Sequence, residues 1–312
     1  MEIVKLGKSD LSVSRLGFGC WQLGGHGWQE NDQKSIIEAI NFALESGVNF
    51  FDTADVYGLG MSETLLGETI NKHPLGKQAI IASKFGVRVN GEQTFYDNSQ
   101  AWLEEAINAS LKRLKRETID LYQIHRHDGK RPLNDIFYDL EKLREQGKIR
   151  WYGISNIDPS QPDMKNPPNG LVSFTMEYSL IKRVYDEQIK TSISHGLGFI
   201  SWGSLAQGLL SGKYNRGSRF AKEDIRSRED SIFAEKNWDY YERLLEVLKK
   251  IAKHHNKNMA QVALRFVLDS HPDSISLAGI KNISQIKDNC GATGWNLSQE
   301  DIADLSIVAR CR

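Results

Sequence analysis

Residues 48–58 read Val-Asn-Phe-Phe-Asp-Thr-Ala-Asp-Val-Tyr-Gly, a short apolar run that ends abruptly in polar side chains. Such a run is typical of a buried strand that leads into a loop. Similar runs recur along the chain, and several stretches between them, such as 33–46, 99–114 and 133–146, have the apolar spacing of amphipathic helices. The predicted strands are residues 16–20, 48–52, 79–84, 119–125, 150–155, 172–177, 199–202 and 274–277.

This alternation predicts an α/β fold with parallel strands and right-handed crossovers. Eight such units within 312 residues predict a closed (β/α)8 TIM barrel that forms a single domain over residues 1–312. Residues 3–6 and 11–13 precede the first unit and predict a β-hairpin that caps the bottom of the barrel. The Pro-rich residues 164–170 replace part of a helix, and the irregular residues 213–236, rich in Lys and Arg, predict a long loop before a helix at 238–255.

The composition excludes several classes of function. Lys plus Arg equals Asp plus Glu at 40 each, so the charge gives no case for nucleic acid or an anionic membrane as partner. The three cysteines, Cys20, Cys290 and Cys311, lack metal-ligand spacing, and their low, odd count suits a reducing compartment. No apolar stretch approaches 18 residues, and the N-terminus lacks a signal-peptide core. We therefore expect a cytoplasmic protein without a metal site.

Four polar residues follow three of the predicted strands: Asp52, Tyr57, Lys84 and His125. The carboxyl ends of barrel strands converge on one face, so we expect these side chains to meet there. A carbonyl attacked by hydride develops negative charge on its oxygen, and Tyr57 can supply the proton that this oxygen needs. A nearby Lys84 ammonium, kept charged by Asp52, is expected to lower the pKa of the phenol, while His125 orients the carbonyl. No side chain donates hydride, so this chemistry requires a cofactor.

Each of these residues taken singly is more often a cap, a loop residue or a structural group. A lysine at a strand end can also be a Schiff-base nucleophile. The combination at three strand ends favours carbonyl reduction. Residues 58–63 match only the first half of G-x-G-x-x-G and follow a loop, so a nicotinamide cofactor must bind without a Rossmann domain.

Several blocks of sequence resemble the aldo-keto reductase family, and they occur in the family's order along nearly the whole chain. The branch most similar to this chain contains bacterial oxidoreductases and potassium-channel β subunits. The matching blocks are residues 51–58 with Ser62-Glu63 and Leu66-Gly67, 82–86, 120–125, 147–150 and 153–156. The resemblance implies that Tyr57 is the general acid, that Lys84 and Asp52 tune it, and that His125 directs the carbonyl.

The resemblance also implies NADP(H) as cofactor. Ser155 and Asn156 match the pair that binds the nicotinamide carboxamide, Trp202 matches the ring that stacks on it, and Thr175 stands where the family has glutamine. Further matches are Ser204, Leu205, Gln207, Gly208 and Lys213 for the pyrophosphate, and Gly279, Lys281, Gln285, Asp288 and Asn289 for the adenosine 2′-phosphate and adenine. The implied substrate pocket is bordered by Trp21, Trp28 and Arg126.

We therefore expect NADPH-dependent reduction of an aldehyde or ketone, with a ketosugar or another polar small-molecule metabolite as substrate. Alternatives left open are a pyridoxal reductase, a Schiff-base enzyme that uses Lys84, and an NADP-binding regulatory subunit like the channel β subunits. Homo-oligomerisation is compatible with all of these.

Overall fold

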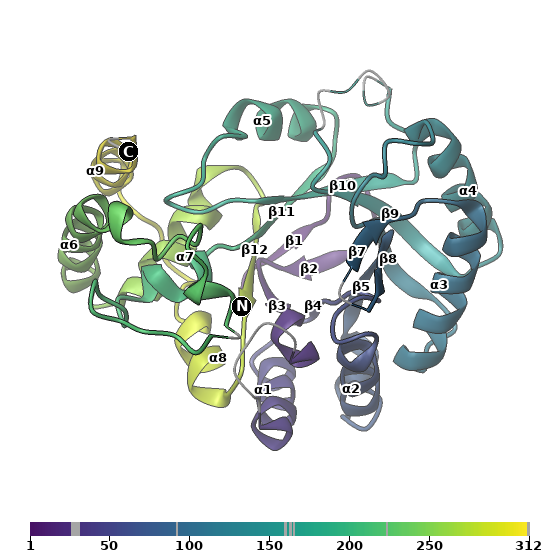
Figure 1. Ribbon diagram of the computed structural model, residues 1–312, viewed down its shortest axis with the longest axis horizontal. Helices are drawn as coiled ribbons and strands as arrows, with labels where there is room; N and C mark the ends of the chain where they lie inside the picture. The colour runs from purple at the N-terminus through teal and green to yellow at the C-terminus, as the bar shows by residue number, and fades with distance from the viewer. Residues whose placement is uncertain are drawn as a thin grey trace.

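Eight parallel strands close into a barrel in the computed structural model, which describes residues 1–25, 32–91, 93–158, 161, 164, 166–222 and 224–310 (Figure 1). Strand β12 pairs with β3 and closes the ring, so the predicted TIM barrel is confirmed. Every predicted strand is present, with ends shifted by no more than two residues. The strands are β3 Leu16–Gly19, β4 Phe50–Asp52, β5 Ile80–Phe85, β8 Ile119–Ile124, β9 Ile149–Ser155, β10 Leu171–Glu177, β11 Gly198–Trp202 and β12 Ile275–Gly279.

Helices cover the outside of the barrel and bury their apolar faces against it (Figure 1). The first begins after Asp32, whose carboxylate accepts hydrogen bonds from the backbone N–H groups of Lys34 and Ser35. The covering helices are α1 Gln33–Glu45, α2 Met61–Ile70, α3 Gln100–Leu114, α4 Leu133–Glu145, α5 Asp186–Ser194, α7 Met259–Ser270 and α8 Ile283–Cys290. Two more, α6 Trp238–His254 and α9 Gln299–Arg310, pack against each other beside this ring. No helix within the described ranges is both long and apolar enough to cross a membrane.

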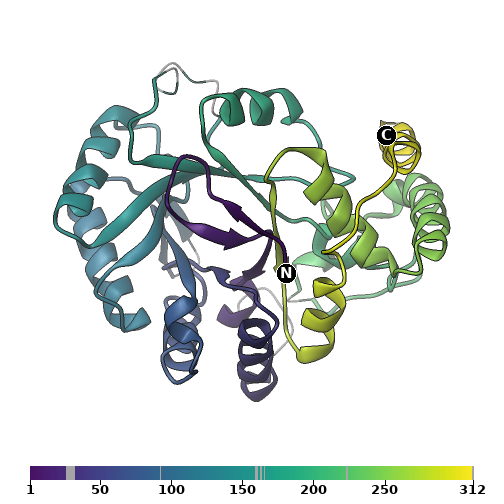
Figure 2. The same cartoon turned by 180° about the vertical axis from the view of Figure 1, so that it is seen from behind.

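The predicted N-terminal hairpin lies across the bottom of the barrel, as Figure 2 shows. Its strands, β1 Ile3–Lys5 and β2 Ser12–Ser14, pair in antiparallel fashion, and Leu6, Leu11 and Val13 fill the lower barrel interior. The turn approaches the barrel so closely that a Cβ on Gly7, at φ +53°, would lie 2.3 Å from a backbone oxygen. A side chain at this position would push the hairpin out of the barrel.

Two connections differ from an ideal barrel unit. No helix occurs among the described residues between β9 and β10, which agrees with the predicted Pro-rich loop. The sequence reading missed a second antiparallel hairpin, β6 Val87–Asn90 with β7 Gln93–Tyr96, which follows β5 on the catalytic side. The Asn90-Gly91 dipeptide at the end of β6, within an alternating stretch, was the available signal.

Aromatic side chains of the long connection before α6 pack together and against the main core. Phe220 and Phe233 contact each other with ring centroids 4.7 Å apart, and both contact Tyr214. Short 3-10 turns at Ile225–Ser227 and Glu235–Asn237 complete the segment, so the residues predicted as an irregular loop form a packed strap.

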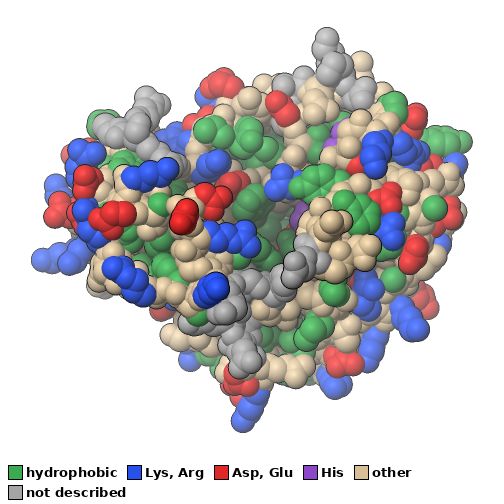
Figure 3. All heavy atoms as spheres, viewed as in Figure 1, with side chains coloured by type: hydrophobic (Ala, Val, Ile, Leu, Met, Phe, Trp, Pro, Cys, Tyr) green, Lys and Arg blue, Asp and Glu red, His purple; other side chains and the backbone are tan. Residues whose placement is uncertain are grey.

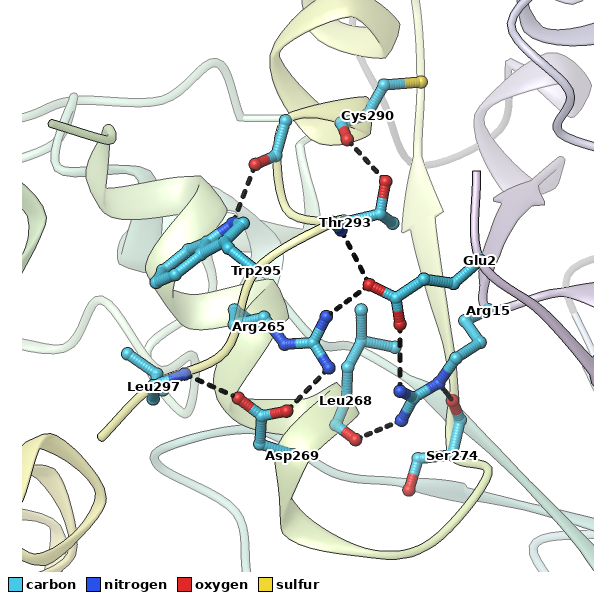
Figure 4. A network of polar contacts seen from close by, with 12 residues as sticks. Glu2, Arg15, Arg265, Leu268, Asp269, Ser274, Cys290, Thr293, Trp295 and Leu297 are labelled. Carbon is cyan, nitrogen blue, oxygen red and sulfur yellow. Dashed lines mark hydrogen bonds and ion pairs between the residues drawn. The ribbon is translucent and has the colours of Figure 1, made fainter. Parts of the chain in front are cut away.

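A partly buried ion network ties the N-terminus to the C-terminal part of the chain (Figure 4). Arg265, which is completely buried, donates hydrogen bonds to Glu2 and Asp269. Glu2 also pairs with Arg15, and Asp269 accepts a bond from the backbone of Leu297. The network therefore joins the hairpin, helix α7 and the segment that precedes α9.

Candidate active site

Asp52 and Lys84 form a buried ion pair at the carboxyl ends of β4 and β5. The Lys84 Nζ lies 2.6 Å from Asp52 Oδ1 and also donates to the Thr53 carbonyl at 2.8 Å. Adjacent parallel strands place both side chains inside the barrel mouth. Burial lowers the pKa of Lys84, but the charges of Asp52 and Tyr57 outweigh that effect and raise it overall, so the group is an ammonium.

Tyr57 and His125 complete the predicted group of four. The Lys84 Nζ lies 5.1 Å from the centre of the Tyr57 ring, and the Tyr57 and His125 rings meet edge to face with centroids 5.7 Å apart. His125 follows β8, and its backbone N–H donates to the Phe85 carbonyl at 2.8 Å. All four catalytic residues predicted from the sequence are thus brought together at one end of the barrel.

The electrostatics of the site differ from expectation at Tyr57. Burial raises the pKa of the phenol, and Lys84 lowers it in the predicted direction but by less, so the pKa lies above its usual value. Burial and the positive charges of Lys84 and Arg126 hold the pKa of His125 well below its usual value. The site therefore presents a protonated phenol and a neutral imidazole, both of which can donate a hydrogen bond to a carbonyl oxygen.

Asn156, which directly follows β9, links the ends of β8, β9 and β11. Its backbone is in the left-handed region at φ +56°, and its Nδ2 donates to Ser155 Oγ at 2.8 Å and to the His125 carbonyl at 3.2 Å. Its Oδ1 accepts a bond from Trp202 Nε1 at 3.1 Å. Ser155, Asn156 and Trp202, which were predicted to meet the nicotinamide, therefore form one rigid wall beside His125.

Thr175 lies deeper in the barrel, and its hydroxyl donates to Gln123 Oε1 at 2.6 Å. The Gln123 amide in turn donates to Asp52 Oδ2 at 3.3 Å. Gln123 is a polar core residue that the sequence reading did not select. Its position two residues before His125, on the same face of the strand, was the available signal.

The predicted pyrophosphate loop turns sharply after β11. Ala206, Gln207 and Gly208 all have positive φ within the 3-10 segment Ala206–Ser211, which follows Ser204 and Leu205. The Gln207 Oε1 is buried and has no hydrogen-bond partner among the described residues. An unpaired buried acceptor of this kind fits a site that is completed by a ligand.

Cations gather where the adenosine phosphate was predicted. Burial and the charges of Arg226 and Lys213 lower the pKa of Lys281 against the opposing charge of Asp224, so both cations lie within electrostatic range of Lys281. Arg226, which belongs to the strap and was missed by the sequence reading, donates to Asp224 at 2.8 Å. Of the remaining predicted contacts, Gly279 ends β12, and Gln285, Asp288 and Asn289 lie on α8, where Gln285 Oε1 accepts a bond from the Lys281 backbone N–H at 2.8 Å. This surplus of positive charge fits a phosphorylated cofactor.

The predicted substrate residues lie at the rim of the site. Trp21, in the 3-10 turn Trp21–Gly24, is 39% exposed, and its ring is 6.4 Å from that of Tyr57. Arg126 is half-buried, and within the described ranges its guanidinium has no ion pair or hydrogen bond. Trp28 lies outside the described residues. Figure 3, which views the catalytic face, has a hollow over the barrel centre with Lys and Arg side chains on its rim.

Glu177, at the end of β10, is a further rim residue that the sequence reading missed. Its carboxylate lies 4.0 Å from Lys182 Nζ, and burial raises its pKa against the opposing charges of Lys182 and Arg126. The rim therefore carries both signs of charge.

A barrel that presents a protonated phenol beside an ammonium, with a cationic groove next to it, defines the class of barrel oxidoreductases that act on carbonyl groups with a phosphorylated nicotinamide cofactor. The chain belongs to the aldo/keto reductase family, whose model matches residues 15–310. It is 32% identical to the aldo-keto reductase YhdN of Bacillus subtilis, over 99% of this chain and 93% of that protein.

Two other relatives support the assignment. A glycerol dehydrogenase structure from Gluconobacter oxydans superposes with a TM-score of 0.90 at 32% identity and covers 98% of this chain and 94% of the other. The Schizosaccharomyces pombe aldo-keto reductase yakc [NADP(+)] is 28% identical over 94% of this chain and 88% of its own length. Like its family, this protein is an NADP-dependent oxidoreductase that acts on carbonyl groups.

Proposed function

We propose that this protein reduces an aldehyde or ketone to the alcohol with NADPH and that Tyr57 is the general acid. The observation that carries the proposal is the position of the Tyr57 phenol, which stacks against charged Lys84 and meets neutral His125. A raised phenol pKa keeps the proton on Tyr57 until the carbonyl oxygen becomes negative. Lys84 then stabilises the phenolate that remains, and Asp52 holds Lys84 in place.

The residues around the hollow are suited to bind NADPH, which supplies the hydride when it is bound. In this proposal Ser155 and Asn156 hold the carboxamide and Trp202 packs against the ring. The turn at residues 204–208 and Lys213 contact the pyrophosphate, and Lys281, with Gln285, Asp288 and Asn289, holds the adenosine 2′-phosphate and adenine. The NADP(+) in the name of the yeast relative and the cluster of Lys213, Arg226 and Lys281 support NADPH over NADH.

A polar, hydroxylated carbonyl compound is the substrate class that we favour, for example a ketosugar. Trp21 offers an exposed ring face, while Arg126 and Glu177 offer a donor and an acceptor to hydroxyl groups. The name of the Gluconobacter relative, a glycerol dehydrogenase, points to the same chemistry. Arg126 accompanied by a carboxylate is less suited to bind an anionic substrate than Arg126 alone.

The test is NADPH oxidation with a panel of neutral and charged aldehydes, ketones and ketosugars, comparing the natural protein with Tyr57→Phe. We expect turnover by the natural protein, and a loss of at least about 100-fold in Tyr57→Phe with unchanged NADPH affinity, as is typical when a general acid is removed. Tight NADPH binding without turnover would instead favour a regulatory subunit. Preferential turnover of pyridoxal would favour a pyridoxal reductase, and loss of NADPH binding in Tyr57→Phe would contradict the assigned role.

A further inference from the structure

A chain of buried polar groups runs beneath the ion pair of the active site. The Thr175 hydroxyl donates to Gln123 Oε1 at 2.6 Å, and Gln123 Nε2 donates to Asp52 Oδ2 at 3.3 Å. The other oxygen of Asp52 accepts from Lys84 at 2.6 Å. The exposed fractions of Gln123, Thr175 and Asp52 are 0%, 1% and 3%, so water does not substitute for these contacts.

The chain has a defined direction. An ionised carboxylate only accepts hydrogen bonds, so Gln123 must turn its NH2 group toward Asp52 and its oxygen toward a donor. Thr175 supplies that donor. If the amide were reversed, its oxygen would face the carboxylate and its NH2 group would face the hydroxyl. The hydrogen bond donated by Thr175 therefore helps to keep the Gln123 amide turned with its NH2 group toward Asp52.

We propose that Gln123 and Thr175 are positioning residues that hold Asp52 ionised and aligned, so that Lys84 stays charged next to Tyr57. This inference rests on the proposed function and extends it, because neither residue touches the carbonyl. It also reassigns Thr175. The single hydroxyl proton of Thr175 is donated to Gln123, so this residue does not replace the family glutamine as a donor to the cofactor.

The reason for such a chain is the cost of burying Asp52. Burial raises the pKa of this carboxyl above its usual value, and the charge of Lys84 and the bonds from Lys84 and Gln123 oppose that effect only in part. A buried carboxylate oxygen that loses its only amide donor is left without a partner, and the charged form becomes less favourable. If Asp52 takes up a proton, the negative charge that holds Lys84 is lost. The Lys84 ammonium is then no longer fixed in its position next to Tyr57.

Two nearly isosteric substitutions test the proposal: Gln123→Met removes the amide, and Thr175→Val removes the hydroxyl. In Gln123→Met we expect the acid limb of the kcat profile to move up by about one pH unit, so that kcat falls about tenfold at pH values on that limb, the size expected for one hydrogen bond to a charged group. Thr175→Val should shift the acid limb of the kcat profile in the same direction by a smaller amount. Thr175→Ser, which keeps the hydroxyl, should have the acid limb of the natural protein. The NADPH Kd should stay within about twofold in all three, because none of these changes alters the charge of the cofactor groove.

Ser173→Ala is the matched control. Ser173 lies on the same strand, two residues before Thr175, and its buried hydroxyl has no partner among the described residues. This variant should keep the natural pH profile. A lower melting temperature in Gln123→Met with an unmoved pH profile would refute the positioning role. A rise in the NADPH Kd of Thr175→Val that accompanies its pH shift would mean that Thr175 contacts the cofactor. Absence of carbonyl turnover by the natural protein would refute the proposed function and this inference together.

Discussion

Asp55→Asn should stabilise the protein, and the gain should grow from pH 5 to pH 8. Asp55 lies in the loop between Asp52 and Tyr57 and is 8% exposed, and neither carboxyl oxygen has a hydrogen-bond partner among the described residues. Burial and the nearby charge of Glu63 raise the pKa of Asp55 to about 8. The carboxyl is therefore protonated in the folded protein at neutral pH and ionised in the unfolded chain.

The sign follows from proton linkage. A folded pKa above the unfolded value of about 3.8 means that the wild-type carboxyl contributes most to stability at low pH and loses that contribution as the pH rises to about 8. The difference is about four pKa units, and each unit corresponds to about 1.4 kcal/mol, so the upper limit is about 6 kcal/mol at pH 8. At pH 5, which is only about one pH unit above the unfolded pKa, the corresponding limit is about 1.4 kcal/mol. Allowing for relaxation around the buried group, we expect Asn to stabilise by roughly 2–4 kcal/mol at pH 8 and by about 1 kcal/mol at pH 5.

Urea unfolding of both proteins at pH 5, 6, 7 and 8 measures this difference, and effects common to both chains cancel. Asp186→Asn serves as the control of opposite sign. His271, Tyr178 and Arg183 outweigh the effect of burial and lower the pKa of Asp186 to about 2. This control should destabilise the protein at neutral pH, and its effect should fade as the pH falls toward 2. A stability difference for Asp55→Asn that stays constant from pH 5 to pH 8, or that favours the wild type at pH 8, would refute the reasoning.

Three further substitutions test the cofactor groove, the rim and the fold. Lys281→Ala should weaken binding of NADPH more than that of NADH in fluorescence titrations, and equal losses would mean that it does not contact the 2′-phosphate. Arg126→Ala should raise the KM of hydroxylated carbonyl compounds more than that of simple aldehydes. An equal change in KM for both kinds of substrate would mean that Arg126 does not contact the substrate's hydroxyl groups. Arg265→Met should destabilise by up to about 3 kcal/mol in urea unfolding because it removes a fully buried cation from the partly buried carboxylates of Glu2 and Asp269, whereas Lys115→Met, which breaks an exposed ion pair, should have little effect.

Local sequence determined the scaffold and the composition of the candidate catalytic site. Apolar runs of strand length that alternate with amphipathic stretches leave few arrangements other than a parallel barrel. Asp52, Lys84 and His125 end or directly follow consecutive barrel strands, so the closure of the barrel alone brings them together. The hairpin at β6 and β7 was predictable in the same way from the Asn90-Gly91 dipeptide and the alternating residues around it.

Burial and long-range contacts were decided only by the tertiary structure. The pKa of Tyr57 depends on how much water the barrel mouth excludes, and this outweighs the neighbouring Lys84 that the sequence made visible. Arg226 reaches the cation cluster because the aromatic core of the strap holds it there, and Gln123 meets Thr175 across 52 residues of chain. A spacing along the chain says nothing about such partners. They depend on which side chains the closed barrel places on the same interior layer, and on how completely that layer is shielded from solvent.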